Sequence, residues 1–125
     1  MTEHPNAATV RRGYEAWNSG DTDVLREGFA EDVVFHFAMS GTCRGQDAVM
    51  DAMGRALQGS GPHLEVEAIL ASDDHIIAFL NVTAERDGKT LDVVLAMPMK
   101  LNAEGKIREV WYIANDQREH DQFWS

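Results

Sequence analysis

The segment from Tyr14 to Phe37 constrains the fold most, because it reads as a helix, a sharp break, a short helix and a strand in direct succession. Gly20 can adopt the left-handed conformation that ends a helix, and Asp21 can accept backbone N–H groups at the start of the next one. That second helix is predicted over Thr22–Ala30. The β-branched and aromatic run Val33–Phe37 then predicts a strand.

Two longer helices are predicted from apolar residues that recur at helical spacing, one over Asn6–Asn18 and one over Gln46–Gln58. In the first, Val10, Tyr14 and Trp17 fall on one face. Such a stripe is typical of a helix that packs against a core. The apolar face of the second helix consists of Val49, Met50, Met53 and Leu57.

The second half of the chain reads as a run of strands. Asp87-Gly88 between two apolar runs is a strong signal for a two-residue hairpin. Residues 38–45, which include Gly41 and Gly45, are predicted to form a loop. Helices followed by a meander of strands indicate an α+β fold rather than alternating βαβ units. The predicted strands are His63–Ser72, His75–Arg86, Lys89–Leu101 and Lys106–Asn115.

Length and composition predict a single domain over residues 1–125 with one packed core, since 44% of the residues are hydrophobic. No apolar run approaches the roughly 20 residues that a membrane helix needs. The polar start of the chain lacks the basic-then-apolar layout of a signal peptide, so a cytoplasmic location is expected.

The net charge of −10 argues against nucleic acid and anionic membranes as partners, because binding to phosphates rests on basic residues. Cys43 is the only cysteine of the chain, which excludes an internal disulfide. No group of His, Asp or Glu has the spacing of metal ligands, so neither a metal nor another cofactor is expected.

The stretch from Tyr14 to Phe37 resembles the start of the SnoaL-like branch of the nuclear transport factor 2-like superfamily. That superfamily includes polyketide cyclases, ketosteroid isomerases and limonene epoxide hydrolases, and the resemblance extends from about Asn6 to Phe123. It implies a cone-shaped α+β barrel of cystatin-like topology, with a strongly curved mixed sheet wrapped around three N-terminal helices. It also implies an internal pocket for a small hydrophobic molecule.

Strand alternation assigns the residues that would line this pocket. On the long strand the apolar side chains from Leu91 to Leu101 share one face, whereas Pro98 is expected to break the ladder and mark a bulge or a bend. An alternative interpretation, in which many of these side chains simply fill the core, stays open. The predicted ligand-binding residues are Tyr14, Trp17, Phe35, Phe37, Met39, Met50, Met53, Phe79, Leu95, Met97 and Tyr112.

Asp116 is the sharpest catalytic candidate, because SnoaL-like cyclases use an aspartate at the end of the last strand as general acid/base. Burial in an apolar pocket would raise the pKa of this carboxyl group toward neutrality. The alternative is that Asp116 caps a C-terminal helical tail over residues 117–123.

His36 is a possible catalytic partner of the aspartate, since these cyclases use histidine and aspartate together. Strict alternation places it on the outer face, which favours a structural or interface role. The other histidines, His63, His75 and His120, are expected in loops, turns or the solvated tail.

Two departures from the ketosteroid isomerases disfavour their mechanism in this chain. Their base aspartate corresponds to Phe37, and their oxyanion-hole aspartate falls near Met97; neither side chain can transfer a proton. The Asp-Arg-Asp set of limonene epoxide hydrolases is not evident either, and Arg44, Arg55 and Arg108 are expected to be exposed.

The outer face of the sheet would present Val94, Trp111 and Ile113 to water in a monomer. Large exposed apolar patches usually mark an interface, so a homodimer joined through this face is predicted. Three functions remain open at this point. They are a cofactor-independent cyclase, isomerase or hydrolase; a non-catalytic binder of a small apolar ligand; and a dimeric protein-interaction adaptor.

Overall fold

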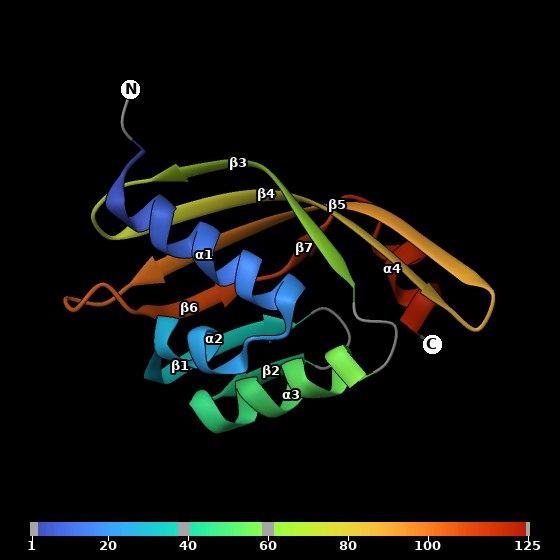
Figure 1. Ribbon diagram of the computed structural model, residues 1–125, viewed down its shortest axis with the longest axis horizontal. Coiled ribbons are helices and arrows are strands. Elements are labelled where there is room, and N and C mark those ends of the chain that lie inside the picture. The colour runs from blue at the N-terminus through green and yellow to red at the C-terminus, as the bar shows by residue number, and fades with distance from the viewer. Residues whose placement is uncertain (1–2, 38–40, 59–61, 125) are drawn as a thin grey trace.

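The computed structural model describes residues 3–37, 41–58 and 62–124, which form one mixed sheet and the helices around it (Figure 1). The helices are α1 (Pro5–Ser19), α2 (Thr22–Gly28), α3 (Gln46–Gln58) and α4 (Gln117–Trp124). The strands are β1 (Phe29–Phe37), β2 (Gly41–Arg44), β3 (His63–Ala71), β4 (His75–Arg86), β5 (Lys89–Leu101), β6 (Ile107–Trp111) and β7 (Ile113–Ala114).

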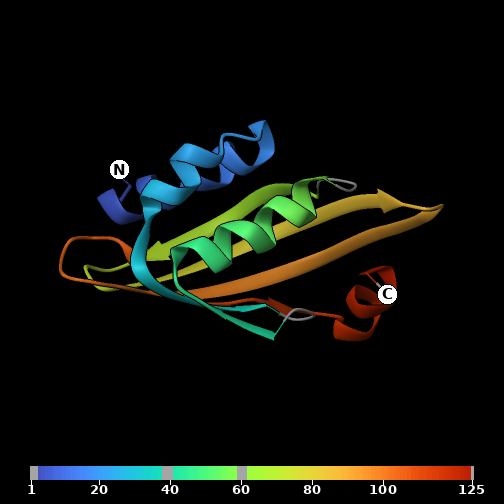
Figure 2. The same cartoon turned by 90° about the horizontal axis from the view of Figure 1, so that it is seen from below.

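The sheet has the order β2-β1-β6-β5-β4-β3, and β7 continues beside β5. β1 and β6 run parallel, and the other pairs are antiparallel. Figure 2 shows α1, α2 and α3 on one side of the sheet, while α4 lies near the far end of the long β4–β5 hairpin. The predicted α+β fold with a curved mixed sheet over three N-terminal helices is confirmed, and the sheet stays open rather than closing into a barrel.

The break between the first two helices forms as predicted. Gly20 has a φ of 77°, and its N–H donates to the carbonyl groups at the end of α1. Asp21 accepts a hydrogen bond from the backbone N–H of Val24, which caps α2. The chain therefore turns sharply after α1, and β1 follows directly after the short helix α2.

The segment before the third helix differs from the prediction. α2 ends at Gly28 rather than at Ala30, and β1 begins at Phe29. Residues 41–44, predicted as loop, form the edge strand β2, which pairs with β1 from Val34↔Arg44 to Phe37↔Gly41. The strand has mostly exposed, polar side chains, so it carries no apolar alternation, and backbone pairing to β1 alone defines it.

The long hairpin forms where the sequence predicts it. Asp87 and Gly88 have φ values of 50° and 78°, the positive pair that a type I′ turn requires. From Arg86↔Lys89 the register runs without a break to His75↔Lys100. Its two strands are the longest of the sheet.

Pro98 interrupts the ladder on one side of β5, as predicted, but no bulge forms toward β4. Pro98 pairs in register with Ile77, and burial alternates along β5 up to Leu101. On its other side β5 pairs with β7 through Ala96 and with β6 through Met99, so Pro98 lies opposite the interruption between these two strands. A residue without an N–H is tolerated there because the neighbouring ladder is already broken.

The core lies between the inner face of the sheet and helices α1 and α3. Val33, Val49, Leu80 and Leu95 are fully buried in it. Each such side chain contributes about 1.5–3 kcal/mol by leaving water. One continuous cluster of buried residues joins the sheet to the helices, and Phe123 of α4 belongs to it.

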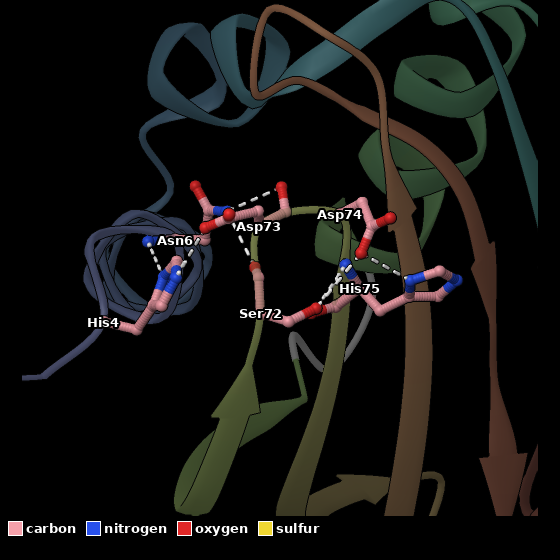
Figure 3. Close-up of polar contacts among 6 residues, drawn as sticks. All are labelled: His4, Asn6, Ser72, Asp73, Asp74 and His75. Atoms are coloured by element: carbon pink, nitrogen blue, oxygen red, sulfur yellow. Dashed lines mark hydrogen bonds and ion pairs between the residues drawn. The ribbon is translucent and has the colours of Figure 1, made fainter.

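The start of α1 is tied to the turn between β3 and β4 (Figure 3). His4 Nε2 lies 3.2 Å from Asp73 Oδ1, and the Asn6 side-chain amide donates to the carbonyl oxygens of Ser72 and Asp73 at 3.0 and 3.2 Å. These contacts fix where α1 crosses the sheet. Among the described residues, no helix has both the length and the apolar character needed to cross a membrane.

Candidate functional site

A cavity of about 810 Å³ is bounded by side chains from all four helices and from strands β1, β3, β4, β5 and β6. Of the predicted ligand-binding residues, those that line this cavity are Tyr14, Trp17, Phe35, Phe37, Met53, Leu95, Met97 and Tyr112.

Two predicted lining residues lie elsewhere, and a third cannot be placed. Met50 is partly buried against the core cluster and is not among the lining residues. Phe79 also differs from the prediction, because it alternates with the fully buried Ala78 and Leu80 and so lies on the outer face of β4. Met39 falls outside the described residues.

Aromatic and thioether side chains make up one wall of the cavity. The rings of Phe35 and Phe37 are stacked with centroids 3.9 Å apart and planes 11° apart. Trp17 is held in place by a 2.7 Å hydrogen bond from its Nε1 to the carbonyl oxygen of Pro62. Met53 and Met97 add flexible, polarisable groups that can fit ligands of irregular outline.

Tyr14 contributes a buried hydroxyl group to this wall. It donates to the sulfur of Met97 at 3.4 Å, and a thioether is a weak acceptor. Desolvation by burial raises the pKa of Tyr14 well above its ordinary value, so the phenol stays protonated at neutral pH. The cavity therefore holds a hydrogen-bond donor that has a poor partner.

A second polar group of the cavity is the pair Tyr112 and His120. The Tyr112 hydroxyl lies 2.8 Å from His120 Nε2, and both residues line the cavity. Burial raises the pKa of Tyr112 and lowers that of His120, while the nearby Asp121 carboxylate opposes the shift of the histidine. At neutral pH both groups are uncharged and hydrogen-bonded.

The expectation that His120 is solvated is wrong, because only 4% of this residue is exposed. α4 folds back against β5, and Phe123, three residues after His120, enters the core cluster with an exposure of 2%. The sequence signal for this burial was the i, i+3 spacing of His120 and Phe123, which places both residues on one face of a helix.

Asp116 adopts the position of the helix cap that was its alternative role. Its carboxylate accepts a hydrogen bond from the backbone N–H of Glu119 at 3.0 Å, directly before α4. The residue is exposed and is not among those that line the cavity.

His36 faces away from the cavity, on the side that alternation predicts. Its Nε2 lies 2.8 Å from Glu109 Oε2 and its Nδ1 lies 3.0 Å from Thr42 Oγ1. Its ring stacks on Trp111 at 5.3 Å. The hydrogen bond from His36 is the main cause that lowers the pKa of Glu109. This cluster joins β1, β2 and β6 on the outer face.

Charged side chains also border the cavity, and they include Arg12, Arg55 and Lys106 as well as Glu27 and Glu104. Arg55 is exposed, as predicted. Lys106 Nζ donates to the carbonyl oxygen of Glu27 at 2.6 Å, which ties the β5–β6 turn to α2. Within the described ranges, no three His, Cys, Asp or Glu side chains gather in a way that could hold a metal ion.

A sequence model of the SnoaL-like domain matches residues 10–110, from within α1 into β6. The chain belongs to the SnoaL-like domain family.

Several proteins resemble this SnoaL-like chain over most of its length. It is 30% identical, over the whole of both chains, to an uncharacterised protein of Mycobacterium tuberculosis H37Rv. Bal32a, a protein from a soil-derived mobile gene cassette, is 34% identical over 96% of each chain and superposes with a TM-score of 0.89. A putative polyketide cyclase of Xanthomonas campestris shares the fold with a TM-score of 0.82, at 20% identity over 96% of each chain.

Proposed function

We propose that this SnoaL-like protein binds a small, flat, hydrophobic molecule in the cavity. The observation that carries the proposal is a cavity of about 810 Å³ whose wall is largely aromatic and aliphatic, with a small number of polar and charged groups. Ligand pockets of roughly 300–1,000 Å³ with apolar walls and a small number of convergent polar groups are typical of small-molecule sites. The family membership supports the same interpretation.

The arrangement of the wall favours an aromatic or polycyclic ligand that carries an oxygen atom. The stacked pair of Phe35 and Phe37 and the ring of Trp17 offer surfaces against which a planar molecule can pack. Among the described residues, the acceptor of the Tyr14 hydroxyl is the Met97 sulfur, so a ligand carbonyl or phenol oxygen would improve its hydrogen bonding.

Cyclase- or isomerase-like proton transfer without a cofactor is the proposed chemistry, in keeping with the family. Non-catalytic binding is the alternative, and it is favoured by Phe37 and Met97, which replace the proton-transferring acids of ketosteroid isomerases. Asp116 as the acid/base stays a prediction, and its exposed position at the N-terminus of α4 favours the capping role.

Titration with 2-naphthol, a flat and neutral bicyclic phenol, tests the binding proposal. We expect saturable quenching of tryptophan fluorescence that is largely lost in a Trp17→Phe variant, because Trp17 lies in the cavity wall. The remaining tryptophans, Trp111 and Trp124, serve as internal references in that variant. A linear, non-saturating response in the wild-type protein would contradict the proposal.

We also propose that a second copy of this chain covers the outer face of the sheet. Leu70, Ile77 and Ile113 are 63%, 39% and 51% exposed, which is unusual for large aliphatic side chains. Leu70 pairs with Ile77, Ile77 pairs with Pro98, and Ile113 pairs with Ala96 on neighbouring strands, so the apolar groups form one continuous area. A two-fold contact would place this area against itself and remove it from water.

A further inference from the structure

The cavity wall contains a hydrogen-bonded pair, Tyr112 and His120, whose side chains can transfer protons. We propose that Tyr112 and His120 form a proton relay that acts on an enolisable carbonyl compound bound beside them. The inference rests on the proposed binding function and assigns the reacting groups within the same cavity.

The backbone holds both groups of this pair in place. Tyr112 lies at the interruption between β6 and β7, where its N–H donates to the His36 carbonyl oxygen at 3.2 Å. His120 lies in the first turns of α4, and its N–H donates to the Asp116 carbonyl oxygen at 3.1 Å. Phe123 packs in the core and holds α4 against the sheet. The His120 imidazole therefore stays in the cavity as long as α4 stays docked.

The hydrogen-bonding pattern selects the form of the imidazole that can accept a proton. Asp121 Oδ1 lies 3.5 Å from His120 Nδ1, so its carboxylate favours the tautomer with hydrogen on Nδ1. Nε2 is then the acceptor for the Tyr112 hydroxyl at 2.8 Å. The phenol, the imidazole and the Asp121 carboxylate, which is 45% exposed, therefore follow one another outward from the cavity, and the last contact is an ionic one at 3.5 Å.

Other charged groups lie on α4 or against it. Lys89 of β5 donates to the Gln122 carbonyl oxygen at 3.4 Å, and Arg118 and Glu119 are exposed on α4. Burial lowers the pKa of His120, which keeps the imidazole neutral and available as a base at neutral pH. Burial raises the pKa of Tyr112, so the phenol passes a proton on rather than ionising by itself.

The reaction balances without a co-reactant. The C–H bond next to the substrate carbonyl breaks, its proton moves to the Tyr112 oxygen, and the Tyr112 proton moves to His120 Nε2. The electron pair of the C–H bond becomes that of the enolate, and the imidazolium is stabilised by the Asp121 carboxylate. Return of the proton through Tyr112 to a different carbon completes an isomerisation. Attack of the enolate on a second carbonyl carbon of the same molecule closes a ring, and the resulting alkoxide then takes the proton back from the imidazolium through Tyr112.

The test uses 2-tetralone, a flat bicyclic ketone with acidic C–H bonds, in D₂O near neutral pD. We expect the wild-type protein to accelerate exchange of these protons, as followed by ¹H NMR. Tyr112→Phe and His120→Gln should each reduce the acceleration by a factor of about 10²–10⁴, the usual contribution of a positioned acid/base group. His63→Gln, which alters an exposed histidine on β3, is the matched control and should leave the rate unchanged.

Binding is measured on the same samples by tryptophan quenching, which separates the two proposals. Saturable binding of 2-tetralone without accelerated exchange would overturn the relay and leave the binding function standing. Absence of binding by both 2-tetralone and 2-naphthol would overturn the binding function, and the relay with it. Full acceleration in Tyr112→Phe and His120→Gln would also overturn the relay.

A pH profile distinguishes a chemical role from a structural one. The exchange rate should fall as the pH drops through the pKa of His120, because the imidazolium cannot accept a proton. In Asp121→Asn the carboxylate that raises this pKa is gone, so the fall should move to lower pH. A profile that does not move, or one without an acid limb, would contradict the assignment of His120 as the base.

Discussion

The hydroxyl of Tyr14 lies 3.4 Å from the sulfur of Met97, on the wall of a cavity that the sheet and helices leave unfilled. A buried phenol usually finds an oxygen or nitrogen acceptor. Here the strand facing α1 supplies a thioether, so the donor is poorly satisfied until a ligand provides a better acceptor. The fold brings α1 over β5, and the resulting contact leaves the Tyr14 hydroxyl with a weak acceptor, which favours binding of a ligand oxygen.

Replacing Tyr14 by Phe should therefore affect ligand binding more than stability. The substitution removes one weak hydrogen bond to sulfur. The free energy of unfolding should therefore change by less than about 1 kcal/mol. Affinity for 2-naphthol should fall roughly tenfold, which corresponds to about 1.4 kcal/mol. Urea denaturation and fluorescence titration measure the two quantities. An unchanged affinity would show that the hydroxyl does not contact the ligand.

Filling the cavity from α1 should block binding without harming the fold. Gly13 lines the cavity, and a Cβ built on it meets nothing within 4 Å. Gly13→Leu should add about 0.5–1 kcal/mol of helix stability and abolish 2-naphthol binding. Gly54→Leu is the matched control, since Gly54 is also helical, has the same open surroundings and does not line the cavity. Equal binding by both variants would place the ligand elsewhere.

The local signals of the sequence predicted the elements that depend on local chemistry. Gly20 and Asp21 predicted the α1–α2 break, and Asp87-Gly88 predicted the hairpin, because each position requires a particular backbone conformation or cap. The edge strand β2 escaped prediction because only pairing with β1 defines it.

The site was predictable only where alternation or helical spacing reports burial. The lining by Leu95 and Met97 followed from the alternation of β5. The place of His120 did not, because it depends on how α4 docks on the sheet, and a short helix after a strand can dock in several ways. The same docking decides whether Asp116 faces the cavity or caps the helix.

Acid should destabilise the protein through His120. Its pKa is lowered in the folded state by burial, so between that pKa and the ordinary value of 6.5 the unfolded chain binds more protons than the folded one. The contribution of His120 is present in full above pH 6.5 and is lost as the pH falls through this window. Urea denaturation at a series of pH values should show a shallower loss in His120→Gln.

Glu109 provides an internal reference for that experiment, since its pKa is lowered by the hydrogen bond from His36. Its stabilising effect is present above its ordinary pKa of 4.5 and is lost only as the pH falls further. The wild type and the His120→Gln variant should therefore lose stability alike below pH 4.5. A His120→Gln variant with the same slope as the wild type near pH 6 would contradict the prediction.

A charge placed on the outer sheet face should dissociate the proposed homodimer. Ile113→Lys introduces a positive charge into the apolar area, where a two-fold contact would bring two such charges together in a desolvated environment. Sedimentation velocity should show a dimer for the wild type and a monomer for this variant. Val24→Lys, which alters an exposed aliphatic residue on α2, should remain dimeric. A monomeric wild-type protein would contradict the interface.

Substitution of Asp116 by Asn separates its two interpretations. Asparagine caps helices about as well as aspartate, so the free energy of unfolding should stay the same, whereas Asp116→Ala should lose about 1 kcal/mol. If the residue only caps α4, exchange of the 2-tetralone protons should be unaffected in Asp116→Asn. The carboxylate is exposed and accepts the Glu119 N–H, so we expect this outcome. Loss of exchange with unchanged stability and binding would instead make Asp116 the proton-transferring group, and the chemistry would then belong to the end of the last strand rather than to α4.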